Sequence, residues 1–200
     1  MAWKTKSIHG KPFGKDVKRH NEAVSYTIKE IMVVHGGGPN EFELVSNARA
    51  GMDENYMDSE TTAEIGYQWE VTREWEGKGP VSADKCDVEV SSTPVYKIEV
   101  TGGADSDARA VAGGKFTIEQ KDKVIGSRQL FFEVKDLPPG GGTVTGANTA
   151  GQKHSFTTAV SSTVSPHTFL IKILLHTYAS RKNNANADVV STLTSTVGVS

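Results

Sequence analysis

Apolar and polar residues alternate along much of the chain, most clearly at residues 67–75. Tyr67, Trp69, Val71 and Trp75 occupy odd positions in this stretch, and polar residues occupy the even ones. A β-strand points successive side chains to opposite faces, whereas a helix would scatter the same aromatic residues around its axis. The pattern therefore predicts a strand with Trp69 and Trp75 as aromatic anchors in a core or an interface.

Similar apolar stretches recur along the chain, separated by clusters of Gly and Pro that are typical of turns. Residues 116–134 predict a hairpin with its turn at 120–123. Residues 168–178 are apolar at both parities and predict the central strand of a covered sheet. Short helices are expected at 16–24 and 105–112. Other strands are expected at 24–34, 42–44, 88–90, 95–100, 156–164 and 189–199, with a turn at 91–94.

Roughly ten short strands with Gly and Pro turns indicate a mainly β protein with little helix. We expect an antiparallel β-sandwich or a jelly-roll-like barrel with long loops, and the pattern is compatible with both. Two hundred residues suit a single domain. We place that domain at residues 23–200, after a basic N-terminal arm at 1–22. Residues at about 46–62 are expected to form a long, polar and acidic loop.

Charge is unevenly distributed, although the net charge is only −2. Residues 1–20 carry six Lys or Arg against one Asp, and residues 41–89 carry thirteen Asp or Glu against four Lys or Arg. Opposite potentials attract, so the arm is expected to dock on the acidic surface of a neighbouring copy. A nucleic-acid contact through phosphate groups and a solvated tail are the other two interpretations. The arm residues are Lys4, Lys6, Lys11, Lys15, Lys18 and Arg19, and the acidic counter-surface consists of Glu41, Glu43, Asp53, Glu54, Asp58 and Glu60.

The sequence has no recognisable catalytic, cofactor or metal motif. The glycines at 36–38 follow a predicted strand but lack the Gly-Lys-Ser/Thr ending of a phosphate-binding loop. The acids at 53–60 lack the spacing of a calcium loop, and the six histidines lack a zinc pattern. Cys86 is the only cysteine, so no intrachain disulfide can form, and no neighbouring base is placed to activate it. We therefore expect no enzymatic activity, no cofactor and no metal.

Location is constrained by two further features of the sequence. The longest apolar block, residues 169–175, is much shorter than the roughly 18 apolar residues that a membrane-spanning helix needs. The basic N-terminal residues are not followed by the apolar stretch of a secretory signal. We expect a protein made in the cytoplasm, without a secretory signal and without membrane contact.

No stretch carries a motif that identifies a family. The general architecture, a β-sandwich with a charged arm, long loops and a Ser/Thr/Gly-rich end, is similar to that of coat, tail and capsid-decorating proteins of viruses and phages. This resemblance implies a non-enzymatic structural subunit of a virion, which self-assembles as a homo-oligomer and contacts other virion proteins. The alternative is a carbohydrate- or ligand-binding module that uses Trp3, Trp69 or Trp75 as a stacking platform.

Overall fold

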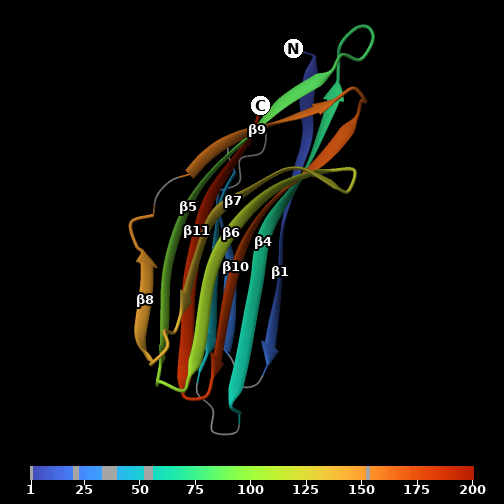
Figure 1. Cartoon of the computed structure of the whole chain (residues 1–200). Coiled ribbons are helices and arrows are strands. Elements are labelled where there is room, and N and C mark those ends of the chain that lie inside the picture. The colour runs from blue at the N-terminus through green and yellow to red at the C-terminus, as the bar shows by residue number, and fades with distance from the viewer. Residues whose placement is uncertain (1, 20–22, 33–39, 52–55, 152–153) are drawn as a thin grey trace.

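Eleven β-strands form two antiparallel sheets packed face to face, and no helix occurs among the described residues (Figure 1). The computed structural model describes residues 2–19, 23–32, 40–51, 56–151 and 154–200, and of these only the backbone at 16–19, 23–32, 40, 154 and 156. The prediction of a mainly β, antiparallel sandwich is confirmed.

The two sheets have defined strand orders. The first sheet has the order β1-β4-β10-β6-β7. Its strands are β1 (Trp3–Arg19), β4 (Asp58–Trp75), β10 (His167–Lys182), β6 (Asp107–Gln120) and β7 (Lys123–Asp136). The second sheet has the order β2-β3-β11-β5-β8, and β9 also pairs with β5. Its strands are β2 (Ala23–Met32), β3 (Asn40–Ala50), β11 (Ala185–Val199), β5 (Asp84–Gly102), β8 (Gly142–Asn148) and β9 (His154–Ser162).

The connections wind these strands as a jelly roll. From β3 onward the chain passes between the sheets at almost every connection, with the β6–β7 hairpin as the step within the first sheet. If β8 and β9 are counted as one interrupted strand, eight strands give the orders β4-β10-β6-β7 and β3-β11-β5-β8/β9. This is the double Greek-key winding of a jelly roll. Strands β1 and β2 extend the two sheets beside β4 and β3.

Pro94 explains why the strand beside β5 is interrupted. β9 pairs with residues 84–92 of β5, and β8 pairs with residues 96–102. The carbonyl oxygen of Pro94 accepts a hydrogen bond from Asn148 Nδ2 at 3.2 Å on this side of the strand. The N–H and C=O groups of a residue in a strand point to the same side. The N–H group that Pro94 lacks would therefore also have pointed to the gap between β8 and β9.

The core has two parts that differ in side-chain size. Phe42, Tyr67 and Trp69 form an aromatic group with ring centroids 4.9–5.5 Å apart. Towards the β10–β11 turn the core becomes rich in alanine, because eight of its twelve buried residues are Ala. Ser46 of β3 and Thr177 of β10 join the two sheets there through a 2.6 Å hydrogen bond between their hydroxyls.

Several expectations are confirmed by the strands. β6 and β7 form the predicted hairpin, with Lys121 and Asp122 in the turn, both at positive φ as a type I′ turn requires. β10 is the central strand of the first sheet. It is covered on one face, however, since its outward residues are mainly half-buried.

Other expectations were wrong at particular segments. The predicted turn at 91–94 lies inside β5, which continues through it because β11 pairs along the whole stretch. Residues 107–112 of the predicted second helix belong to β6, and residues 16–19 and 23–24 of the first belong to β1 and β2. The connection between β3 and β4 covers 51–57, so it is shorter than the loop expected at 46–62. The segment expected to be a separate arm at 1–22 forms β1 over residues 3–19.

Candidate functional site

Strand β1 lies along β4 at the edge of the first sheet. The register runs from Trp3 opposite Trp75 to Arg19 opposite Glu60, with one irregularity between Thr5 and Ser7. The inward positions beyond that irregularity include Gly10, Pro12 and Gly14, which bring little apolar surface to the core. The Tyr67 ring fills the space beside Gly10, because a Cβ there would lie 2.6 Å from Tyr67 Cε1. β1 is therefore attached mainly through its backbone ladder and its outward side chains.

Ion pairs reinforce this seam from the outside. Lys4 and Lys6 approach Glu76 at 2.7 and 2.6 Å, and Lys6 also approaches Glu74 at 3.4 Å. Lys15 pairs with Glu64 at 2.8 Å. Hydrogen bonds from Lys4 and Lys6 hold the pKa of Glu76 at about 2, well below its ordinary 4.5. The complementarity expected between neighbouring copies is thus formed within one chain.

The remaining arm residues lie on the same strand. Lys11 is exposed and stands opposite Gln68, and Arg19 stands opposite Glu60. The side chains of Lys18 and Arg19 lie outside the described part of the structure. Lysines and a proline on an edge strand also discourage pairing with other chains. A segment rich in lysine that also contains proline is therefore as typical of a protected sheet edge as of a basic arm.

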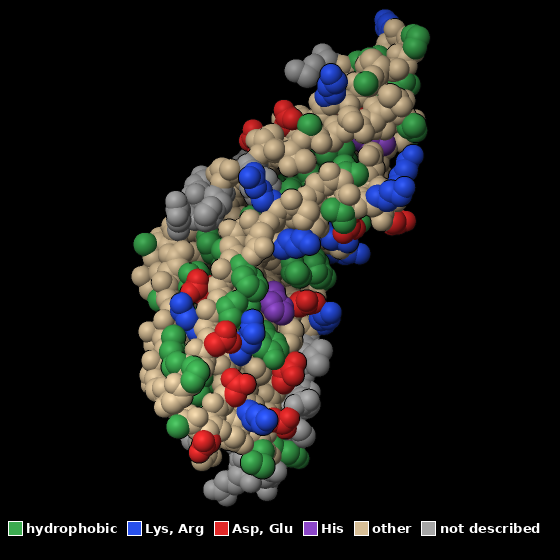
Figure 2. All heavy atoms as spheres, viewed as in Figure 1, with side chains coloured by type: hydrophobic (Ala, Val, Ile, Leu, Met, Phe, Trp, Pro, Cys, Tyr) green, Lys and Arg blue, Asp and Glu red, His purple; other side chains and the backbone are tan. Residues whose placement is uncertain are grey.

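The six predicted acidic residues do not form one surface. Glu41 and Glu43 point outward from β3 in the second sheet, whereas Asp58 and Glu60 point outward from β4 in the first. The outer faces of a sandwich look in opposite directions, so the two pairs are separated by the core. Asp53 and Glu54 lie outside the described residues. Figure 2 shows basic and acidic side chains interspersed over the face in view.

A buried polar network that was not among the sequence-based predictions joins four strands near the start of β10. Asp84 accepts two hydrogen bonds from Arg73, from Nε at 2.6 Å and from the second guanidinium nitrogen at 3.0 Å. His167 Nε2 lies 2.7 Å from the same carboxylate, and Arg73 also donates to Thr5 Oγ1 at 3.0 Å. Burial opposes ionisation of Asp84, but the hydrogen bonds from Arg73 and His167 outweigh it and hold the pKa of Asp84 below its ordinary value.

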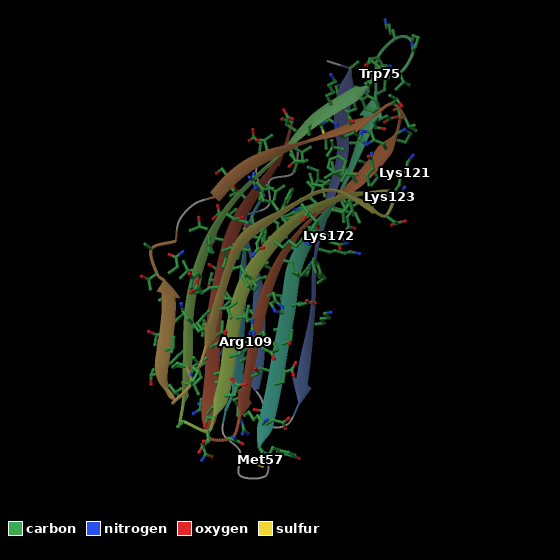
Figure 3. All side chains as sticks on the ribbon, in the orientation of Figure 1. Met57, Trp75, Arg109, Lys121, Lys123 and Lys172 are labelled. Atoms are coloured by element: carbon green, nitrogen blue, oxygen red, sulfur yellow. The ribbon has the colours of Figure 1, made fainter. Side chains whose placement is uncertain are left out.

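Trp3 packs against this network, and Trp75 packs against Trp3. The Trp3 ring meets Trp75 and His167 edge-on, with centroid distances of 5.8 and 5.4 Å. Trp3 Nε1 donates to the carbonyl oxygen of Ser82 at 2.9 Å. Trp75 is the last residue of β4 and lies at the upper end of that strand in Figure 3. Trp69 is 3% exposed and belongs to the core, so it cannot serve as a stacking platform.

A second buried cation fixes the opposite end of β10. Arg181 Nε donates to the Gly51 carbonyl and to Ser59 Oγ, both at 2.8 Å. Its first terminal nitrogen donates to the carbonyls of Tyr56 and Asn183 at 3.0 and 3.1 Å. One guanidinium thus holds the β3–β4 and β10–β11 connections together.

A pocket of about 380 Å³ opens on the outer face of the first sheet beside the network. Its floor is the row Glu70, Leu170 and Glu119 on β4, β10 and β6. One wall is the β6–β7 turn, and the other is the β9–β10 connection with Pro166. The pocket combines carboxylates, an amide, hydroxyls and an aliphatic surface, from Glu70, Glu119, Gln120, Asp122, Ser162, Thr168, Leu170, Val164 and Pro166, together with Lys121.

The described part of the chain contains neither an exposed cysteine nor a cluster of side chains suited to a metal ion. Cys86 is fully buried, and burial raises the pKa of its thiol to about 11, so the nucleophilic thiolate is scarce. Groups of three or more His, Cys, Asp or Glu suited to a metal ion are absent from these residues.

Comparisons with known proteins leave the family open. No family model matches the chain, and no curated protein matches it. A cyclase from Fischerella sp. TAU has 10% identity, covers 88% of this chain and 98% of its own, and has a TM-score of 0.19. The enzymatically active domain of bacteriophage CBA120 tailspike protein 4 has 7% identity, covers 84% and 19%, and has a TM-score of 0.15. A structure of infectious bursal disease virus, Gx strain, has 8% identity, covers 94% and 40%, and has a TM-score of 0.17.

These neighbours include phage and viral proteins as well as a cyclase, and likeness at such TM-scores carries no argument about function. The described part of the chain has no helix that is long and apolar enough to span a membrane.

Proposed function

We propose that the protein is a non-enzymatic structural subunit that assembles with copies of itself, as a coat, tail or capsid-decorating component of a virion. The jelly-roll winding supports this proposal, because viral capsid proteins are among the main users of the fold. Lectins and cupins use it as well, so the fold alone does not decide between these classes.

The observation that carries the proposal is the way β1 is held. The backbone of β1 pairs with β4. Its lysines form ion pairs with acids on β4 or directly after it: Lys4 and Lys6 with Glu76, and Lys15 with Glu64. Every copy offers the same β4 edge, so β1 of one copy fits β4 of another in the same register. Exchange of an identical element is a low-cost route to oligomers, because each contact broken within a chain is replaced by its equivalent between chains.

Two singly substituted proteins test the exchange directly. Copies with Lys11→Cys are refolded together with copies with Gln68→Cys, all carrying Cys86→Ala, and then oxidised. Lys11 and Gln68 are register partners, so a disulfide between the two kinds of copy is expected only where β1 has crossed over. The matched control pairs Lys11→Cys with Glu43→Cys, because Glu43 points outward from the other sheet.

Light scattering of the unmodified protein across concentration and salt tests the assembly itself. Discrete assemblies with the cross-link support both parts of the proposal, and exposed ion pairs should make them weaker in high salt. Assemblies without the cross-link overturn the exchange and leave self-assembly standing. A monomer under all conditions overturns self-assembly. Binding of single-stranded or duplex DNA that weakens steeply with salt would instead assign the lysines of β1 to a nucleic acid.

A further inference from the structure

The pocket on the outer face of the first sheet has polar edges and an apolar middle. Leu170 stands directly opposite Glu70 on one side and Glu119 on the other. Neighbouring strands lie about 4.8 Å apart, so the backbones that carry the two carboxylates are about 10 Å apart with an aliphatic side chain between them. Val164 and Pro166 add apolar surface from the β9–β10 connection.

Charge in the pocket disfavours ionic ligands. Glu70, Glu119 and Asp122 are partly balanced by Lys121, and Lys172 lies 2.6 Å from Glu119. Figure 3 shows Lys121 at the tip of the β6–β7 hairpin and Lys172 below it on β10. Three carboxylates repel a phosphate or another anion, and the nearby lysines weaken the attraction for a polyamine.

The polar side chains of the pocket can form hydrogen bonds with the hydroxyl groups of a ligand. Carboxylates accept hydrogen bonds, and the Gln120 amide and the Thr168 hydroxyl both donate and accept. The Ser162 hydroxyl already donates to the Val164 carbonyl oxygen at 3.2 Å. We propose that this pocket binds a neutral saccharide, with ring hydroxyls on Glu70 and Glu119 and a C–H face of the sugar on Leu170. The volume falls within the range of about 300–1,000 Å³ that is usual for small-molecule sites.

Parts of the pocket are held in place before any ligand binds. The ion pair with Lys172 orients Glu119, and the Thr72 and Thr168 hydroxyls lie 3.2 Å apart beside the floor. Gln120 Nε2 lies 3.4 Å from His167 Nδ1, whose other ring nitrogen lies against Asp84. A preformed site loses less entropy on binding than one that must be ordered by its ligand.

An NMR titration of the isotopically labelled full chain tests this assignment. The probes are glucose, galactose, mannose, N-acetylglucosamine, lactose and maltose, with spermidine and inorganic phosphate as charged comparisons. At least one sugar is expected to shift the backbone amides of Leu170, Gln120 and Lys121 in a saturable way. Glu70→Ala should weaken that binding about tenfold or more, as expected for a lost hydrogen bond to a charged group. Glu43→Ala, on the other sheet, should leave it unchanged.

Failure to respond to every sugar overturns the proposal, and so does saturable binding of spermidine or phosphate in their place. Equal weakening by Glu70→Ala and Glu43→Ala would place any sugar elsewhere on the surface. This test of sugar binding is independent of the test of self-assembly. A monomer that binds sugar would support the proposed sugar site and contradict the proposed self-assembly.

Discussion

Arg73 and Asp84 form a two-point ion pair that bridges the two sheets, with one N–O distance of 2.6 Å and the other of 3.0 Å. Arg73 is the last buried residue of β4, and Asp84 opens β5 in the opposite sheet. Both side chains are buried, so each depends on the other for the solvation that water no longer supplies. The pair therefore fixes how the ends of the two sheets meet.

Replacing Asp84 by Asn should destabilise the protein by about 3–5 kcal/mol, because the buried Arg73 loses its counter-charge. Urea unfolding of both proteins measures the difference. Asp87→Asn is the matched control, since Asp87 lies on the same strand but is exposed. Equal midpoints for the two variants would show that the buried pair does not bear on stability.

The pKa of Glu76 predicts a stabilisation that depends on pH. Because this pKa is lowered to about 2, the ion pairs with Lys4 and Lys6 contribute fully above the ordinary value of 4.5 and are lost as pH falls towards 2. An NMR titration of the Glu76 carboxyl should show the low midpoint. The double substitution Lys4→Ala and Lys6→Ala should return it towards 4.5, and an unchanged midpoint would contradict the assigned cause.

Cys86 should be inert in the folded protein. Its thiol is fully buried and its pKa is raised to about 11, so the native protein should react with a disulfide reagent at pH 8 far more slowly than the unfolded chain. Absorbance of the released thiolate follows both reactions. Similar rates in the presence and absence of urea would mean that the strand opens readily at this point.

Gly66 links the attachment of β1 to the centre of the first sheet. The Phe13 ring of β1 lies over this glycine, and a Cβ at residue 66 would lie 2.5 Å from the Ile173 carbonyl oxygen. Gly66→Ala should therefore cost about 1–3 kcal/mol, as overpacking does. In the Gly66→Ala variant, hydrogen exchange should become faster in β1 than in the unmodified protein, and it should change less in β10. Uniform protection in both strands would contradict a specific loosening of the edge.

The sequence predicted the features that depend on local alternation. The strand around Trp69 and the hairpin at 116–134 follow from side chains that point alternately to two faces. The central strand at 168–178 follows from a run that is apolar at both parities. The role of residues 3–19 does not follow from that rule. Gly10, Pro12 and Gly14 resemble a flexible tail until the Tyr67 ring and the β4 ladder occupy the space beside them.

The buried network had a signal in the sequence that alternation alone could have exposed. Arg73 takes an inward position in an otherwise apolar row, and Arg181 does the same at the end of β10. An inward charge predicts a buried partner, because an unpaired charge in a core is costly. The identity of that partner depends on how β4, β5 and β10 meet, which no local pattern contains. The pocket depends in the same way on residues from three separate segments of the chain.

Pro94 has a consequence for the edge of the second sheet. Since it supplies no amide donor where β8 and β9 are interrupted, the two strands are held to β5 by separate ladders. Each ladder can open without breaking the hydrogen bonds of the other, so the edge should behave as two cooperative units rather than one. One proline in the middle of β5 thus divides the edge of a continuous sheet into two parts, and each part should open and close at its own rate.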